Sequence, residues 1–174
     1  MKQEMVDTAR SLLKQNMALK AGEELLVIVD ETTLTIGKAL FEAGEQLQAK
    51  AMLLQMQPTG RSGAEPSKTV AKAMATADVV IAATSDSLSH TKARREASAA
   101  GVRIATMPGI KEEMFKGGAM QADYAQVAAL ARKLAQKLTV AKEAVVEKDG
   151  CRLTMSLEER QGAACTGMCQ EKGD

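Results

Sequence analysis

Residues 77–110 read ADVVIAATSDSLSHTKARREASAAGVRIATMPGI, and this stretch decides the fold. An apolar run (79–83) leads into a hydroxyl-rich turn, an Ala-rich segment closes at Gly101, and a second apolar run (102–105) ends at a Met-Pro-Gly sequence. Strand, turn, helix and strand in this order predict a βαβ unit with parallel strands and a right-handed crossover. Ligands of open α/β sheets bind beyond the carboxyl ends of the strands. We therefore expect any small-molecule site of this unit at residues 84–91 and 106–110.

The flanking sequence extends this unit in both directions. Apolar residues at helical spacing predict a first helix that runs to about Leu19 and is ended by Gly22. Apolar runs at 25–29 and 51–56 predict two more strands, and Asp30 to Thr33 can cap the helix between them. The chain is therefore predicted to be an α/β protein, with a three-layer Rossmann- or flavodoxin-like parallel sheet of at least four strands.

The pattern changes after a long helix that begins near Asp123. Apolar residues alternate with polar ones on both sides of Asp149-Gly150, which predicts a C-terminal β-hairpin. Hairpins do not belong to a βαβ series, so we expect an α/β domain at 1–141, and a hairpin and tail at 142–174 that open a second domain. Because the tail has few apolar residues, we expect the chain to be a fragment.

Composition narrows the class of protein. The chain is 45% hydrophobic and 26% charged, as in globular proteins, and its net charge is only +1. It has no basic stripe interleaved with aromatic residues and no apolar run of membrane-span length, so neither nucleic acid nor membrane is an expected partner. The first residues lead straight into an amphipathic helix without a secretory signal, and we expect a cytoplasmic protein.

His90 is the only histidine, and it lies where a helix should begin. A helix N-terminus disfavours the imidazolium, so a neutral His90 could donate to or accept from a polar ligand. A half-exposed histidine without a task is an equally good interpretation. The surrounding hydroxyls and backbone N–H groups suit an anion or a peptide-like group, although ordinary helix capping explains most of them individually.

Two further groups of residues could take part in chemistry. Lys92, Arg94 and Arg95 form a basic helix face that is expected to be solvated, and Arg94 is the best candidate of the three for a ligand contact. The three cysteines (Cys151, Cys165 and Cys169) have a loose spacing without a nearby histidine, which argues against a closed zinc site. The residues alone show no complete active site.

The central block nevertheless resembles a known family. The sequences Ala-Asp-Val-Val-Ile-Ala-x-Thr, Ser-Leu-Ser-His-Thr-x-Ala-Arg-Arg-Glu-Ala and Gly-Val-Arg-Ile-Ala-Thr-Met-Pro-Gly-Ile are similar to the N-terminal domain of the aminopeptidase T and S type of metallo-aminopeptidases. The match is to the shorter, leucyl aminopeptidase-like branch. Glu65-Pro66, Ala122-Asp123-Tyr124 and Leu153-Thr154-Met155-Ser156 extend the resemblance over nearly the whole chain.

The resemblance implies the metal-free part of a metal-dependent aminopeptidase that hydrolyses N-terminal peptide bonds and is inactive alone. The divalent ions of such enzymes (Zn, Co, Mg or Mn) are bound by a C-terminal domain, so no metal ligand and no catalytic residue is assigned here. A homodimer and a peptide or small-molecule substrate are the expected partners.

Two alternatives stay open beside the aminopeptidase. One is a related mononuclear-iron dioxygenase that opens a dihydroxypyridine ring, in which a histidine of the Ser-Leu-x-His region reaches the substrate. That resemblance favours His90 as a substrate contact. The other alternative is a non-catalytic α/β ligand-binding module. The candidate substrate-binding residues are His90, Ser87, Ser89, Thr91, Arg94, Pro108 and Gly109.

Overall fold

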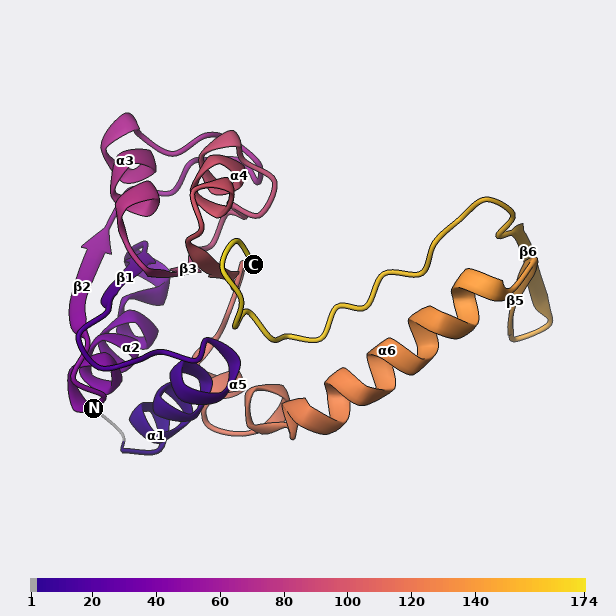
Figure 1. The fold of residues 1–174 in the computed structure, drawn as a ribbon, viewed down its shortest axis with the longest axis horizontal. Coiled ribbons are helices and arrows are strands. Elements are labelled where there is room, and N and C mark those ends of the chain that lie inside the picture. The colour runs from indigo at the N-terminus through magenta and orange to yellow at the C-terminus, as the bar shows by residue number, and fades with distance from the viewer. Residues whose placement is uncertain (1–2) are drawn as a thin grey trace. The chain divides into compact units, whose positions relative to one another are not determined.

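A computed structural model describes residues 3–174 and contains a parallel sheet of four strands in the order β2-β1-β3-β4 (Figure 1). The strands are β1 (Glu24–Val29), β2 (Lys50–Gln55), β3 (Val79–Ala83) and β4 (Arg103–Thr106). All three pairings are parallel, with Leu25 opposite Ala51 and Val79 in register. The predicted α/β class and the parallel sheet are confirmed.

Helices alternate with these strands along the chain. They are α1 (Gln3–Ser11) with a π-helical continuation (Leu12–Asn16), a 3₁₀ turn (Glu31–Thr33) leading into α2 (Leu34–Gln46), α3 (Lys68–Thr76), α4 (Lys92–Ala99), α5 (Glu112–Phe115), a second 3₁₀ turn (Gly118–Gln121) and α6 (Tyr124–Val140). The first helical segment ends at Asn16 rather than near Leu19, and the chain turns at Ala18 (φ +45°) before Gly22 (φ +82°).

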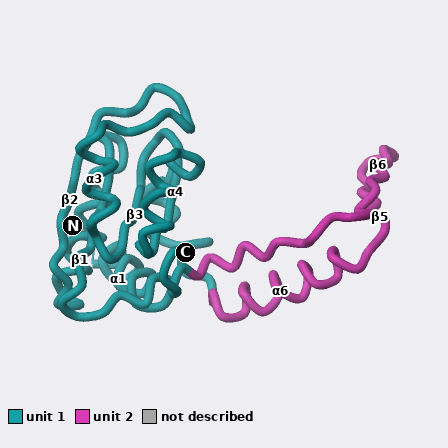
Figure 2. The backbone as a smooth tube through the Cα atoms, turned by 45° about the horizontal axis from the view of Figure 1, so that its top comes forward, with its two compact units in different colours: residues 1–122, 169–174 teal, residues 123–168 magenta. Residues whose placement is uncertain are grey.

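The chain divides into two compact units, coloured separately in Figure 2. The first comprises residues 3–122 and 169–174, and the second comprises residues 123–168. The expected domain boundary after residue 141 stays a prediction. No helix in the described range 3–174 combines the length and apolarity needed to cross a bilayer.

The first unit has three layers. Alternate residues of β1 and β3 pack on one face against α1, α2 and Phe115, and the intervening residues pack on the other face against α3 and α4. β3 is buried along its whole length, as expected for a strand covered on both sides. The two cores hold the strands so that all their carboxyl ends lie at the same end of the sheet.

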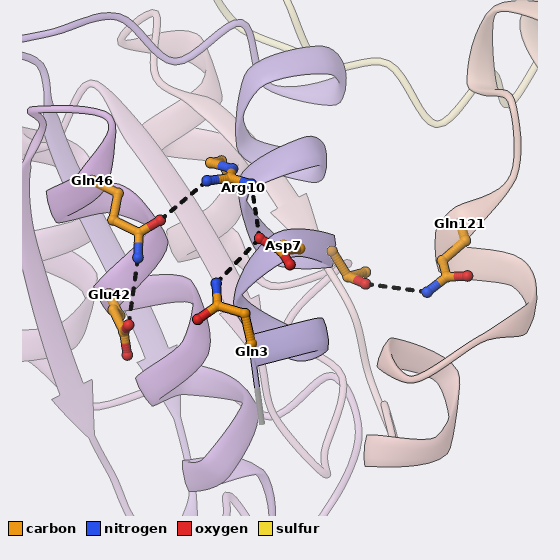
Figure 3. A network of polar contacts seen from close by, with 7 residues as sticks. Gln3, Asp7, Arg10, Glu42, Gln46 and Gln121 are labelled. Atoms are coloured by element: carbon orange, nitrogen blue, oxygen red, sulfur yellow. Dashed lines mark hydrogen bonds and ion pairs between the residues drawn. The ribbon is translucent and has the colours of Figure 1, made fainter. Parts of the chain in front are cut away.

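Helix α2 lies unusually close to the sheet. A Cβ atom placed on Gly37 would come within 2.4 Å of the Val29 side chain, and one on Gly44 within 2.6 Å of Leu25. The two glycines therefore let the helix backbone approach β1 directly. On the solvent side, Arg10 of α1 bonds Asp7 at 2.7 Å and reaches Gln46 of α2 at 3.5 Å (Figure 3).

The last residues of the chain belong to the first unit and cover part of its sheet edge. The carbonyl of Asp174 accepts a hydrogen bond from the backbone N–H of Ile104 in β4 at 2.9 Å. The N–H of Cys169 donates to the carbonyl of Asn16 at 2.8 Å. The segment 169–174 is thus tied to both β4 and the end of the first helical segment.

The second unit contains α6 and an antiparallel hairpin of β5 (Glu143–Lys148) and β6 (Cys151–Ser156). Asp149 (φ +50°) and Gly150 (φ +78°) form its turn, which confirms the predicted hairpin. Asp123 caps α6 by accepting from the N–H groups of Ala125 and Gln126. In this unit several large apolar side chains are exposed: Val127, Leu130, Leu134, Leu138, Val140, Val145, Val146, Leu153 and Met155.

Candidate functional site at the carboxyl ends of the strands

Strands β1 and β3 are neighbours, but the chain leaves them toward opposite sides of the sheet, to β2 and to β4 respectively. Such a reversal point is where open α/β sheets bind ligands. Asp30 follows β1 and Ser85 follows β3 by two residues, so both lie at this point. The candidate site is therefore built outward from this pair.

Asp30 is a buried carboxylate, 0% exposed, that joins the two strand ends. Its Oδ2 accepts from the backbone N–H of Ser85 at 2.5 Å and from the Ser85 hydroxyl at 2.6 Å. Its Oδ1 accepts from the N–H of Thr32 at 3.0 Å and from the Thr32 hydroxyl at 2.7 Å. Burial raises the pKa of Asp30, but the hydrogen bonds from Ser85 and Thr32 outweigh burial and hold the pKa below its ordinary value.

The loop after β3 is connected to the end of β4 through hydroxyl groups. Ser87 Oγ donates to Ser89 Oγ at 3.0 Å, and Ser89 Oγ is 2.7 Å from Thr106 Oγ1. The N–H of Gly109 donates to the carbonyl of Thr84 at 2.9 Å. The two segments singled out in the sequence, 84–91 and 106–110, therefore meet at one edge of the sheet.

A third loop, between β2 and α3, packs on the same edge. Asp86 Oδ2 accepts from the N–H of Gly60 at 2.7 Å. Ser87 donates its N–H to Ser62 Oγ at 3.1 Å and accepts from the N–H of Gly63 at 2.8 Å. We refer to the three loops (57–67, 84–91 and 106–110) as the rim.

The N-terminus of α4 is already occupied by protein groups. The carboxylate of Glu65 accepts from the N–H groups of Lys92 at 2.5 Å and Ala93 at 3.1 Å. Thr91 Oγ1 accepts from the N–H of Arg94 at 3.2 Å. The backbone hydrogen bonds from Lys92 and Ala93 hold the pKa of Glu65 below its ordinary value. This helix end therefore has little capacity left for an external anion.

The candidate substrate-binding residues have different environments on the rim. Thr91 is 0% exposed, and its hydroxyl donates to the carbonyl of Leu88, so it acts within the protein. Ser87 and Ser89 are half-buried within the hydroxyl chain. His90, Pro108 and Gly109 are exposed, and Arg94 is half-buried on α4.

His90 is held by its backbone rather than by its ring. Its carbonyl accepts from the Arg95 guanidinium at 2.9 Å. Within residues 3–174, no hydrogen bond or ion pair engages the imidazole. The ring is therefore available to a ligand, in agreement with its expected exposure near a helix start.

The described residues do not form a metal centre. Within residues 3–174, no three His, Cys, Asp or Glu side chains come together in a way that could hold a metal ion. The three carboxylates nearest this site, Asp30, Glu65 and Asp86, each accept a hydrogen bond from a protein N–H group.

The sequence patterns did not indicate the roles of Glu65 and Ser85 in the rim or the contact of Asp30 with Ser85. Glu65 was noticed only as part of the family resemblance, although it caps a helix 27 residues further along the chain. Ser85 was included only among the loop hydroxyls, and Asp30 was interpreted as a local cap. The signal that could have found them is the order of the strands. Asp30 follows β1 and Ser85 follows β3, two adjacent strands from which the chain continues toward opposite sides of the sheet.

Comparison with known proteins shows the fold. The chain matches no protein-family model and no curated protein. Among solved structures, it is similar to 2,5-dihydroxypyridine dioxygenase from Pseudomonas putida KT2440, with a TM-score of 0.72 and 17% identity over 97% of this chain and 51% of that one. It thus spans about half the length of that protein.

Two further solved structures give lower scores. AmpT from Thermus thermophilus gives a TM-score of 0.49 at 12% identity, over 83% of this chain and 50% of that one. A fatty acid ABC transporter substrate-binding protein from Thermomonospora curvata gives 0.43 at 15% identity, over 92% and 57%. Neighbours of this α/β kind include a dioxygenase, an aminopeptidase and a binding protein.

Proposed function

We propose that this chain is the N-terminal, metal-free part of a metal-dependent aminopeptidase and that its rim forms one wall of the substrate cleft. One observation carries the proposal. The family-like segments around Ser-Leu-Ser-His-Thr and Thr-Met-Pro-Gly-Ile lie apart in sequence but meet at the rim, where Ser89 Oγ is 2.7 Å from Thr106 Oγ1. Segments that carry the resemblance thus converge where α/β sheets bind ligands.

The residues of the rim would have separate tasks in this role. Ser87, Ser89 and Thr91 fix the loop by hydrogen bonds within the protein, which holds His90 in place. The exposed His90 ring would contact the substrate, and Arg94, Pro108 and Gly109 would border the same space. This chain would bind and orient the substrate and exclude water from one side.

Peptide-bond hydrolysis would need groups that residues 3–174 do not bring together. In the proposed enzyme, divalent ions (Zn, Co, Mg or Mn) would supply polarisation of the scissile carbonyl and activation of water. Their ligands would come from a part of the whole protein other than this chain. The chain spans about half of the dioxygenase it matches, which is consistent with a second domain of similar size. We further propose a cytoplasmic homodimer.

A ring-cleaving dioxygenase is the second candidate function. The likeness to the 2,5-dihydroxypyridine dioxygenase covers 97% of this chain with a TM-score of 0.72, so it includes the second unit as well as the sheet. Under this alternative the substrate would be a dihydroxylated aromatic ring rather than a peptide. His90 would contact the ring hydroxyls. The two candidates therefore share the site and differ in the substrate class.

The decisive experiment compares metal content and activity of this chain with those of the longest product of its gene. The aminopeptidase proposal expects metal binding and cleavage of aminoacyl p-nitroanilides only in the longer product. Consumption of 2,5-dihydroxypyridine with Fe(II) and oxygen, without peptidase activity, would favour the dioxygenase. Absence of both activities would leave a binding module and contradict the enzyme proposal.

The site assignment is tested by His90→Ala in the active product. We expect kcat/KM to fall at least tenfold, which corresponds to about 1.4 kcal/mol of lost transition-state stabilisation. The matched control is Lys72→Ala, an exposed side chain of α3 outside the rim. If His90→Ala and the control retain the same activity, His90 is not a substrate contact.

A further inference from the structure

Ser85 presents an unusual hydroxyl at the reversal point of the sheet. The residue is exposed, yet its N–H and its hydroxyl both donate to the same buried oxygen of Asp30, at 2.5 and 2.6 Å. A serine hydroxyl has one proton and two lone pairs. Because its proton is directed inward to Asp30, the Ser85 hydroxyl offers only lone pairs to a ligand.

Neighbouring donors on the rim are also directed into the protein. Thr84 Oγ1 donates to the carbonyl of Asp86 at 2.7 Å, and Ser87 Oγ donates to Ser89. The N–H groups of Gly60 and Gly109 donate to Asp86 and to Thr84. These four donors therefore have acceptors inside the protein, and the expectation that the loops suit an anion or a peptide-like group stays a prediction.

The negative charge of Asp30 further favours a ligand that donates a hydrogen bond to Ser85. No Lys, Arg or His side chain in the range 3–174 lies within ion-pair distance of its carboxylate. The carboxylate is instead stabilised by neutral donors from Ser85 and Thr32. An uncompensated buried negative charge directly behind an exposed hydroxyl favours a ligand group that is positive or donates hydrogen bonds.

We propose that Asp30 is a positioning residue that fixes the Ser85 hydroxyl as a hydrogen-bond acceptor for the amino end of the substrate, either its ammonium group or its first amide N–H. This inference deepens the proposed aminopeptidase function and rests on it for the identity of the substrate. That the Ser85 hydroxyl can only accept hydrogen bonds from a ligand does not depend on that function.

Whether Ser85 accepts a hydrogen bond from an ammonium group is tested by binding alone, on the 174-residue chain and without an activity assay. Its ¹H–¹⁵N spectrum is recorded during titration with leucinamide, which has an ammonium group, and with 4-methylpentanoate, which has the same side chain and a carboxylate. We expect leucinamide, and not 4-methylpentanoate, to shift the Ser85 amide resonance. An equal or larger shift with 4-methylpentanoate, or no shift with either probe, overturns the proposal.

Substitutions then separate binding from folding. Ser85→Ala should abolish the shift with leucinamide at neighbouring amides, and Ser85→Thr, which keeps the hydroxyl, should restore most of it. Ser11→Ala, at an exposed serine of α1, is the matched control and should respond like the unchanged chain. If Ser85→Ala retains the full response, Ser85 is not the acceptor.

Asp30→Asn tests the positioning role. An amide cannot accept on both sides, so either Ser85 or Thr32 would lose its acceptor, and the Ser85 proton would no longer be held inward. We expect at least a tenfold weaker leucinamide affinity in a chain whose remaining spectrum is folded. Unchanged affinity overturns the role of Asp30. If the variant does not fold, the Ser85→Ala and Ser85→Thr pair still decides whether Ser85 is the acceptor, and the proposal falls if it is not.

Kinetics in the longer gene product distinguish this inference from the proposed function. Ser85→Ala should raise KM for aminoacyl p-nitroanilides about tenfold with little change in kcat. A longer product without peptidase activity but with the leucinamide response refutes the aminopeptidase and leaves the acceptor role of Ser85 intact. Peptidase activity with an unaltered KM in Ser85→Ala refutes the acceptor role alone.

Discussion

Arg103 of β4 forms a buried ion pair with Glu23, with Arg103 Nη2 2.6 Å from Glu23 Oε2. The Arg103 side chain is 7% exposed, and its other terminal nitrogen donates to the carbonyls of Met17 and Ala18 at 2.7 and 2.9 Å. A single guanidinium thus satisfies three acceptors in the segment between the first helical segment and β1. These acceptors lie at the amino ends of the strands, opposite the rim.

The first prediction concerns this pair. Arg103→Met should lower the free energy of unfolding by roughly 3–5 kcal/mol, because it leaves the Glu23 carboxylate and two carbonyls without their donor. Urea denaturation followed by circular dichroism measures the change. Arg152→Met is the control, since its ion pair with Glu147 is about two-thirds exposed (63% and 62%) and should contribute at most about 1 kcal/mol. Equal effects of the two substitutions would contradict the prediction.

The second prediction concerns pH. The folded-state pKa of Asp30 lies below its unfolded value, so the ionised carboxylate stabilises the fold fully above the unfolded value of about 3.9. This stabilisation is lost as the pH falls through the folded-state pKa. The difference in unfolding free energy between the unchanged chain and Asp30→Asn should therefore be constant near neutral pH and shrink below about pH 4. A difference that grows on acidification would refute the assignment.

The third prediction concerns the contact between α2 and the sheet. Alanine favours a helix over glycine by about 1 kcal/mol, yet Gly37→Ala should destabilise the chain by about 1–3 kcal/mol. The reason is that the added Cβ would lie 2.4 Å from Cγ1 of Val29, a β-branched side chain with few alternative rotamers. Thermal unfolding compares it with Thr35→Ala, an exposed position on the same helix. A gain in stability from Gly37→Ala would show that the helix can move away.

The fourth prediction concerns the N-terminal cap of α4, the helix that follows His90 in the sequence. Glu65→Gln should speed hydrogen exchange of the Lys92 and Ala93 amides, because a neutral amide is a weaker acceptor than the carboxylate that now receives both. Exchange measured by NMR should be unchanged in Glu96→Gln, whose side chain is exposed on the same helix. Protection that is equal in both variants would exclude Glu65 as the cap.

The fifth prediction concerns the hydroxyl of Ser98. Among the described residues, Ser98 Oγ is the one buried side-chain polar atom without a hydrogen-bond partner. Removing an unsatisfied buried hydroxyl and gaining helix propensity in α4 should stabilise the chain by about 1 kcal/mol in Ser98→Ala. Ser11→Ala, an exposed serine on another helix, serves as the comparison. A loss of stability in Ser98→Ala alone would reveal a partner for this hydroxyl.

The sequence was sufficient to predict the sheet because its strands are continuous apolar runs bounded by turn residues. The cap at Asp30 was also predictable, because it is a short polar side chain just ahead of a helix and accepts from a nearby N–H group. The rim was predictable only as a location. That Glu65 caps α4 and that Asp86 holds Gly60 depends on contacts between distant loops, which no local pattern encodes.

The segment 169–174 pairs with a backbone group on the outer edge of β4. β4 is an edge strand, and the Asp174 carbonyl accepts from the Ile104 N–H that would otherwise point outward from it. Unpaired edge groups are templates for pairing with another chain. The segment 169–174 therefore hinders pairing of β4 with a strand of another chain. A version shortened to Met168 would leave the Ile104 N–H of this edge strand unpaired, even though every strand and helix of the first unit is still present.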